Sequence, residues 1–254
     1  MVNTKNVLQC LVLIGMAISW NARAMEVQPV SSRRAELIEE YRKELTQFLS
    51  NDQVDVNARI AKIHNYPLEA ACYYDELSDL TDQLLQRGAR VDLYNELWSS
   101  LIHICVLNNR TPVNLEKLAL YAPGQGVDFS KLIKVSNSYG FTPLSEAFLF
   151  TNISHARFLL RLGENINSRH DDKPVFAYFL RSWLQSEEPQ TATLERMLAL
   201  ALAHKITQPT LNNCLDSITR FAELPKYHEA RARLEAALRV EQEERLNDAS
   251  AVTT

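Results

Sequence analysis

The sequence is poor in glycine and proline, with 6 glycines and 9 prolines among 254 residues. Collagen-like repeats and flexible low-complexity segments are therefore excluded, because both are built largely from these two residues. Apolar residues make up 46% of the chain and charged residues 23%. This balance excludes intrinsic disorder, since the apolar fraction is large enough to form a substantial core.

Cysteine is also scarce, and the four cysteines are widely spaced with no CxxC pattern. Neither a disulfide framework nor a zinc site is indicated. Cys72, Cys105 and Cys214 lie in apolar helical context, where a buried free thiol is the usual explanation. There is no HExxH arrangement and no glycine-rich phosphate loop. The sequence therefore predicts no metal and no cofactor.

An excess of basic residues is absent as well. The chain has 27 lysines and arginines against 31 aspartates and glutamates, and its formal net charge is −4. Nucleic acid is excluded as a partner on this ground, because phosphates require a basic surface.

No apolar run is long enough to cross a bilayer, which needs roughly 20 residues. The apolar run at 7–20 follows Lys5 and precedes Ala22-Arg23-Ala24, which has the small-x-small pattern of a signal-peptidase site. We expect a signal peptide at 1–24, cleaved after Ala24, and an exported mature chain that is periplasmic or extracellular. An uncleaved membrane anchor is the alternative.

The segment 137–163 reads NSYGFTPLSEAFLFTNISHARFLLRLG and predicts a helix–turn–helix unit. Pro143 suits the first turn of a helix, where a missing N–H leaves nothing unpaired. Gly163 suits the left-handed residue that ends a helix. Between them lie two apolar-periodic runs, at 144–150 and 156–162. Leu144, Ala147 and Phe148 lie at helical spacing and form one expected buried stripe.

Weaker copies of this pattern recur along the chain. Helix starts are indicated at Tyr66-Pro67-Leu68, at 99–105 and at Lys173-Pro174-Val175. The closing segment 163–167, GENIN, is echoed by GARVD at 88–92 and by VDVNA at 54–58. Because one helix pair cannot bury both of its faces, such units must stack on one another.

This pattern resembles the ankyrin repeat family, whose unit of about 33 residues starts its first helix with Thr-Pro-Leu-His-x-Ala. The resemblance implies an all-α fold, a single-domain ankyrin-repeat solenoid of stacked helix-turn-helix units with helical caps. We expect an N-terminal cap or partial repeat at 25–57, repeats over 58–206, a C-terminal helical cap at 207–246 and a disordered tail at 247–254. The four repeats are expected at 58–92, 93–128, 137–169 and 170–206.

The resemblance also implies where a partner would bind, because the family uses its turn tips and the outward positions of its first helices to line a concave groove. The helix positions here are Tyr73, Tyr74, Val106, Leu107, Leu149, Phe150 and Arg181. The turn positions are Trp98, Tyr139, Phe141, His170 and Asp172. This set is unusually apolar and aromatic, and exposed aromatic clusters mark protein contacts. We therefore expect a monomeric, non-catalytic protein–protein interaction scaffold, unless loops or a neighbouring chain cover these residues.

Two other functions stay open. A secreted cysteine-dependent hydrolase would use Cys72 or Cys105, although His103 and Cys105 point in different directions on one helix. A self-associating structural protein would use the aromatic groove as its own interface. Calcium at Asp171-Asp172 is less favoured than a simple turn, because no further ligands follow at metal spacing.

Overall fold

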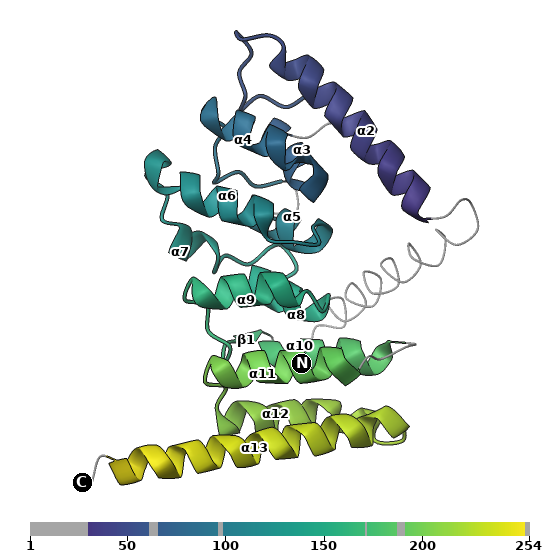
Figure 1. Cartoon of the computed structure of the whole chain (residues 1–254), viewed down its shortest axis with the longest axis vertical. Helices are drawn as coiled ribbons and strands as arrows, with labels where there is room; N and C mark the ends of the chain where they lie inside the picture. Colours follow the sequence, from purple (N-terminus) through teal and green to yellow (C-terminus); the bar gives the residue numbers. More distant parts are fainter. Residues whose placement is uncertain (1–29, 61–65, 96–98, 171, 187–190, 252–254) are drawn as a thin grey trace, which may run out of the picture. The chain divides into compact units, whose positions relative to one another are not determined.

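The computed structural model describes residues 30–60, 66–95, 99–170, 172–186 and 191–251 (Figure 1). These residues are mostly helical, and the all-α prediction is confirmed. The strands among them are β1 (Arg169–His170) and β2 (Lys173–Pro174), which pair antiparallel. No described helix is both long and apolar enough to cross a membrane. The expected signal peptide at 1–24 lies outside the described residues.

The chain forms two compact units, Met1–Arg90 and Val91–Thr254. The helices described in the first unit are α2 (Val30–Leu49), α3 (Pro67–Cys72), η1 (Asp75–Leu77) and α4 (Ser78–Gln86). Those of the second unit are α5 (Leu101–Asn108), α6 (Val113–Tyr121), η2 (Pro123–Gln125), α7 (Phe129–Leu132), α8 (Pro143–Leu149), α9 (Ile153–Arg161), α10 (Val175–Gln185), α11 (Thr191–Ala203), α12 (Gln208–Ile218), η3 (Thr219–Phe221) and α13 (Pro225–Ala251).

Helix α8 begins as the sequence predicts. Pro143 is its first residue, and the Thr142 hydroxyl accepts a hydrogen bond from the Ser145 amide at 3.3 Å. Thr142 therefore pairs one of the amides that the first turn leaves without a helical partner. The predicted stripe of Leu144, Ala147 and Phe148 is fully buried.

The helices of the second unit pack in two rows (Figure 1). In one row α5, α8, α10 and α12 contact one another in turn, and we call these the inner helices. In the other row α9 contacts α11, and α11 contacts α13. Phe148 on α8 meets Phe176 on α10 edge-on, with ring centroids 5.6 Å apart. Each helix pair thus buries its apolar face against the next pair.

One correction concerns the end of the chain, where a disordered tail was expected from residue 247. Helix α13 continues to Ala251 and includes the first residues of that tail. Its sequence is rich in Ala, Arg and Glu, and extending an existing helix by such residues is easy because the costly step, nucleation, has already been made.

The same helix ending occurs five times among the described residues: once after α8, where Thr151 is left-handed with a φ of 56° and the Asn152 amide donates to the Ala147 carbonyl at 2.7 Å, and four times near the end of a predicted repeat. A left-handed residue follows the helical turn at Gly88, Gly126, Gly163 and Lys205, with φ of 86°, 71°, 96° and 57°. The next amide then donates to a carbonyl five residues earlier. These bonds are Ala89 to Leu84, Val127 to Ala122, Glu164 to Leu159 and Ile206 to Ala201, at 2.9 to 3.2 Å. The carbonyls left open by the helix end are paired in this way.

Two loops, one in each unit, repeat a second arrangement. The Asp55 carboxylate accepts from the Asn57 amide at 2.9 Å, and the Asn165 side chain accepts from the Asn167 amide at 2.9 Å. The residue between the two polar residues is buried in both loops: Val56 is 6% exposed and Ile166 is 1% exposed. The turn chemistry therefore fixes which side chain of each loop enters the core.

The last residue of each loop then bonds to the next loop along the chain. Asn57 donates to the Gly88 carbonyl at 3.2 Å and accepts from the Arg90 amide at 2.8 Å. Asn167 donates to the Lys205 carbonyl at 3.1 Å and accepts from the Thr207 amide at 2.8 Å. We call these contacts the asparagine bridges. They join successive helix pairs within each unit.

Lys205→Gly should raise the free energy of unfolding by about 0.5–1 kcal/mol, because a left-handed conformation strains any residue with a Cβ atom and glycine takes it freely. Urea denaturation measures the change. Lys205→Ala is the matched control, since it removes the same exposed side chain but keeps the strain. Equal stabilisation by both variants would contradict the role assigned to this position.

Candidate functional site

The inner helices α5 and α8 carry exposed apolar side chains at their C-terminal ends. Leu107 is 38% exposed and Phe150 is 46% exposed, and Leu149 beside it is partly exposed. The Asn152 side chain donates to the Val106 carbonyl at 3.0 Å and to the Asn109 carbonyl at 3.2 Å. These two bonds hold the segment after α8 against the end of α5, so the predicted groove residues Leu107 and Phe150 lie on neighbouring helix ends. We call Leu107, Leu149 and Phe150 the apolar end patch.

Val106 does not belong to this surface, and its prediction as a binding residue is corrected. It has no exposed surface, and the side chains from Leu101 to Val106 are all buried. Helix α5 is therefore packed on every side up to Val106, and its exposed apolar side chain is Leu107. The predicted position of Val106, counted from the start of the helix, was on the outer surface, but its side chain lies in the core.

Arg181 lies on α10, which packs against α8, and its side chain is partly exposed. Trp98 lies outside the described residues.

The predicted turn residues Phe141 and His170 come together with Tyr178, which the sequence analysis did not single out. Ring centroids are 4.6 Å apart for Phe141 and His170, 5.5 Å for Phe141 and Tyr178, and 5.6 Å for His170 and Tyr178. Tyr178 donates its hydroxyl to the His170 carbonyl at 3.1 Å. These aromatic rings therefore pack on one another, which leaves less of each for a partner.

The remaining turn positions are more polar in their contacts. Tyr139 is partly exposed, and its amide donates to the Asn137 side chain at 3.0 Å. Asp172 is exposed, with a φ of 59°, and its carbonyl accepts from the Arg169 guanidinium. In the described part of the chain, no three or more His, Cys, Asp or Glu side chains are grouped to hold a metal ion.

A polar cleft of about 330 Å³ lies between the loops that precede and follow α8 and α9. Its lining carries charges of both signs, from Lys134, Glu164 and Arg169, with His170 beside them. Burial raises the pKa of the Glu164 carboxyl, while the neighbouring Lys134 opposes the shift. The turn side of the second unit is therefore polar and charged here, in contrast to the apolar end patch.

In the first unit, the predicted residues Tyr73 and Tyr74 are partly buried against Tyr41 of α2. The Tyr41 ring centroid lies 6.0 Å from that of Tyr73 and 5.8 Å from that of Tyr74. Burial raises the pKa of the Tyr41 and Tyr74 hydroxyls. No sequence pattern predicts this contact, because it depends on how α2 crosses the helices that follow it.

The cysteines lie in the core. Cys72, Cys105 and Cys214 are fully buried, and burial raises the pKa of the Cys214 thiol. A catalytic thiol must be reachable and readily ionised. The arrangement offers no support for the cysteine-dependent hydrolase.

His103 is a structural residue by its contacts. Its Nδ1 accepts from the Ser100 amide at 3.2 Å, so the proton is on Nε2, which donates to the Phe141 carbonyl at 2.9 Å. Burial lowers the pKa of His103 to about 4, and the imidazole is neutral near pH 7. The segment Ser100-Leu101-Ile102-His103 therefore starts α5, and His103 ties it to the next loop.

Glu146 on α8 is a buried carboxyl with a single described partner. Its Oε1 accepts from the Asn137 side chain at 2.7 Å, and its Oε2 has no partner among the described residues. Burial raises the pKa of Glu146 to about 8. The carboxyl is thus mostly protonated at pH 7, which makes its burial tolerable.

A comparison of the chain with known protein families finds no match, and neither does a comparison with curated proteins. The resemblance to ankyrin repeats therefore rests on the sequence pattern alone.

The contribution of Glu146 to the free energy of unfolding should fall as the pH rises from 4.5 to 8, whereas His103 and His155, whose pKa burial lowers to about 4, contribute in the opposite sense below about pH 6.5. In this window the unfolded state, with a pKa near 4.5, loses the Glu146 proton before the folded state does at about 8. Glu146→Gln should remove most of this loss, on the order of a few kcal/mol. Urea denaturation at pH 5, 7 and 8.5 measures it. The exposed Glu116→Gln is the control, and an unchanged pH dependence in Glu146→Gln would contradict the assignment.

Proposed function

We propose that this chain is a non-catalytic scaffold of the ankyrin-repeat type, which binds a partner protein through the ends of its inner helices. The fold part of this proposal is supported by the helix endings that recur near the ends of the four predicted repeats and by the two asparagine bridges. Repeats that share one set of backbone contacts stack in the same way, and stacking of this kind is how a solenoid is stabilised.

The observation that carries the binding part is the apolar end patch. Leu107 and Phe150 are among the few large apolar side chains exposed in the described residues, and they lie on neighbouring helix ends. Isolated exposed apolar residues need no explanation, but a group of them next to one another indicates a contact surface. An aromatic side chain at the centre of such a patch is a common anchor for a partner.

The partner is an apolar peptide or an amphipathic helix of another protein. A narrow surface of two helix ends suits a few side chains from one extended or helical segment, as in other groove-binding proteins. Since residues 1–24 have the pattern of an export signal, the partner is expected in the periplasm or outside the cell.

Leu107→Ala combined with Phe150→Ala should weaken binding of the partner by about ten-fold or more, because truncating a buried apolar anchor removes at least about 1.4 kcal/mol. The partner is first captured from a native extract with residues 25–254 and is then purified for titration calorimetry. Leu120→Ala is the matched control: Leu120 is 75% exposed on α6, away from the patch.

The competing functions predict other results. Equal affinity of the double variant and the control for the partner would contradict the assignment of the patch. A dimer that the double variant converts to a monomer, seen by light scattering, would support the self-associating protein instead.

A further inference from the structure

Within the first unit, helix α2 lies over two of the residues expected to bind a partner. Its Tyr41 ring packs on Tyr73 and Tyr74, which follow α3. Tyr73 and Tyr74 also lie close to each other, with centroids 6.3 Å apart. We call Tyr41, Tyr73 and Tyr74 the tyrosine cluster. A partner can reach the faces of Tyr73 and Tyr74 that Tyr41 covers only when α2 moves.

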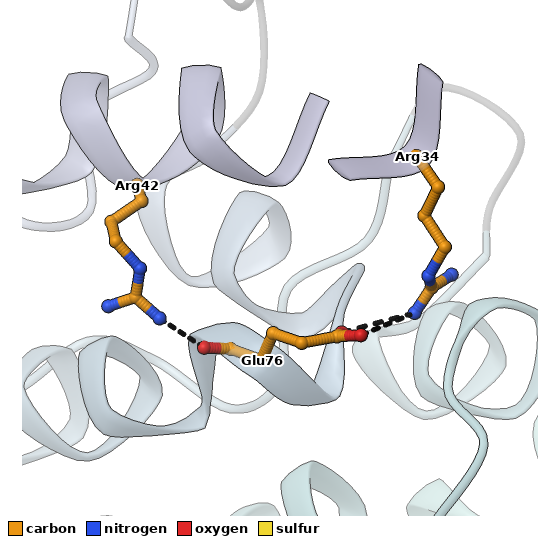
Figure 2. Close-up of polar contacts among 3 residues, drawn as sticks. All are labelled: Arg34, Arg42 and Glu76. Carbon is orange, nitrogen blue, oxygen red and sulfur yellow. Dashed lines mark hydrogen bonds and ion pairs between the residues drawn. The ribbon is translucent and has the colours of Figure 1, made fainter. Parts of the chain in front are cut away.

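Two arginines tie the first half of α2 to the segment that follows α3 (Figure 2). The Arg34 guanidinium donates to both Glu76 carboxylate oxygens, at 3.1 and 3.4 Å, and lies 4.9 Å from the Tyr74 ring centroid. Arg42 pairs with the Asp79 carboxylate at 2.9 Å and also donates to the Glu76 carbonyl. Glu76 in η1 therefore bonds to both arginines, to Arg34 through its carboxylate and to Arg42 through its carbonyl, as Figure 2 shows.

The contacts of the two halves of α2 differ in kind. Among residues 33–43, Ile38 is the one buried side chain, and the ion-paired groups are 24% to 56% exposed. The second half is fixed by Leu45, which is fully buried. Its end is fixed by Arg87, which donates to the Leu49 carbonyl at 2.8 Å and to the Asn51 carbonyl at 2.9 Å.

This division has a physical consequence. Exposed ion pairs contribute little to stability and are weakened by salt, whereas a buried leucine cannot leave the core without a larger loss. The first half of α2, with Ile38 as its one buried side chain, therefore loses less by detaching than the second half, which is fixed by Leu45 and Arg87.

We propose that residues 33–42 of α2 are a displaceable strap, which covers the tyrosine cluster and limits access of the partner to Tyr73 and Tyr74. This inference rests on the proposed function, since Tyr73 and Tyr74 would be a further contact of the same partner. The strap and the surface compete, so the protein binds its partner most tightly when the strap is released.

The test compares Arg34→Gln combined with Arg42→Gln against Arg33→Gln combined with Lys43→Gln. The control pair lies on the same helix, removes the same charge and affects exposed side chains. Hydrogen exchange should become about ten-fold faster at amides 34–42 in the test variant, while amides in α3 and α4 keep their protection. Tetranitromethane should nitrate Tyr73 and Tyr74 several-fold faster, as located by mass spectrometry.

Three outcomes would overturn the strap. Exchange and nitration equal to those of the control would show that the arginines do not hold it. Loss of protection throughout α2, α3 and α4 together would show that α2 is an integral part of the unit. Unchanged affinity for the captured partner, in a variant whose strap has opened, would show that it does not limit access.

The failure of the strap and the failure of the proposed function can be told apart. Exchange and nitration need no partner, and the apolar end patch lies in the other unit. A partner that is lost on Leu107→Ala and Phe150→Ala but is indifferent to the strap variant would leave the proposed function standing and remove only this inference.

Discussion

The asparagine bridges are the contacts on which the described arrangement depends. A helix pair has no intrinsic reason to sit at one height against the next pair, because apolar packing is non-directional. Asn57 and Asn167 supply the direction, each by donating to one backbone group and accepting from another in the following loop. With the loops held in register, the buried residues Val56 and Ile166 enter the core at equivalent places. The ends of α5 and α8 are held together by a separate contact, that of the Asn152 side chain.

That placement determines which surfaces are available for binding. In the second unit the ends of α5 and α8 are held together by Asn152, and the side chains beyond the core stripe are left exposed as the apolar end patch. In the first unit the corresponding residues Tyr73 and Tyr74 are partly covered by α2. The residues that follow α3 are therefore partly covered, whereas those at the ends of α5 and α8 are exposed. Arg34 and Arg42 tie the covering helix through exposed ion pairs, and such pairs are sensitive to salt.

Much of the local structure could be predicted from the sequence, because it depends on short-range chemistry. Thr142-Pro143 marks the start of α8, and the apolar spacing of Leu144 and Phe148 marks its buried face. Other features depend on tertiary packing, and no local sequence pattern predicts them. A lysine in the left-handed position of Lys205 could not be read from its residue type, since glycine is the usual occupant. Val106 was placed outward by counting along α5, whose side chains are all buried from Leu101 to Val106. Tyr41 and Tyr178 were missed because their partners are distant in the sequence or on another element.

The most direct test of this account is hydrogen exchange at the Thr207 amide in the Asn167→Ala variant. The bridge predicts that this amide, which donates to the Asn167 side chain at 2.8 Å, loses protection by about ten-fold or more. The Arg90 amide, bonded to Asn57 in the other unit, should keep its wild-type rate. Full protection of Thr207 in the variant would contradict the claim that the asparagine bridges hold successive helix pairs in register.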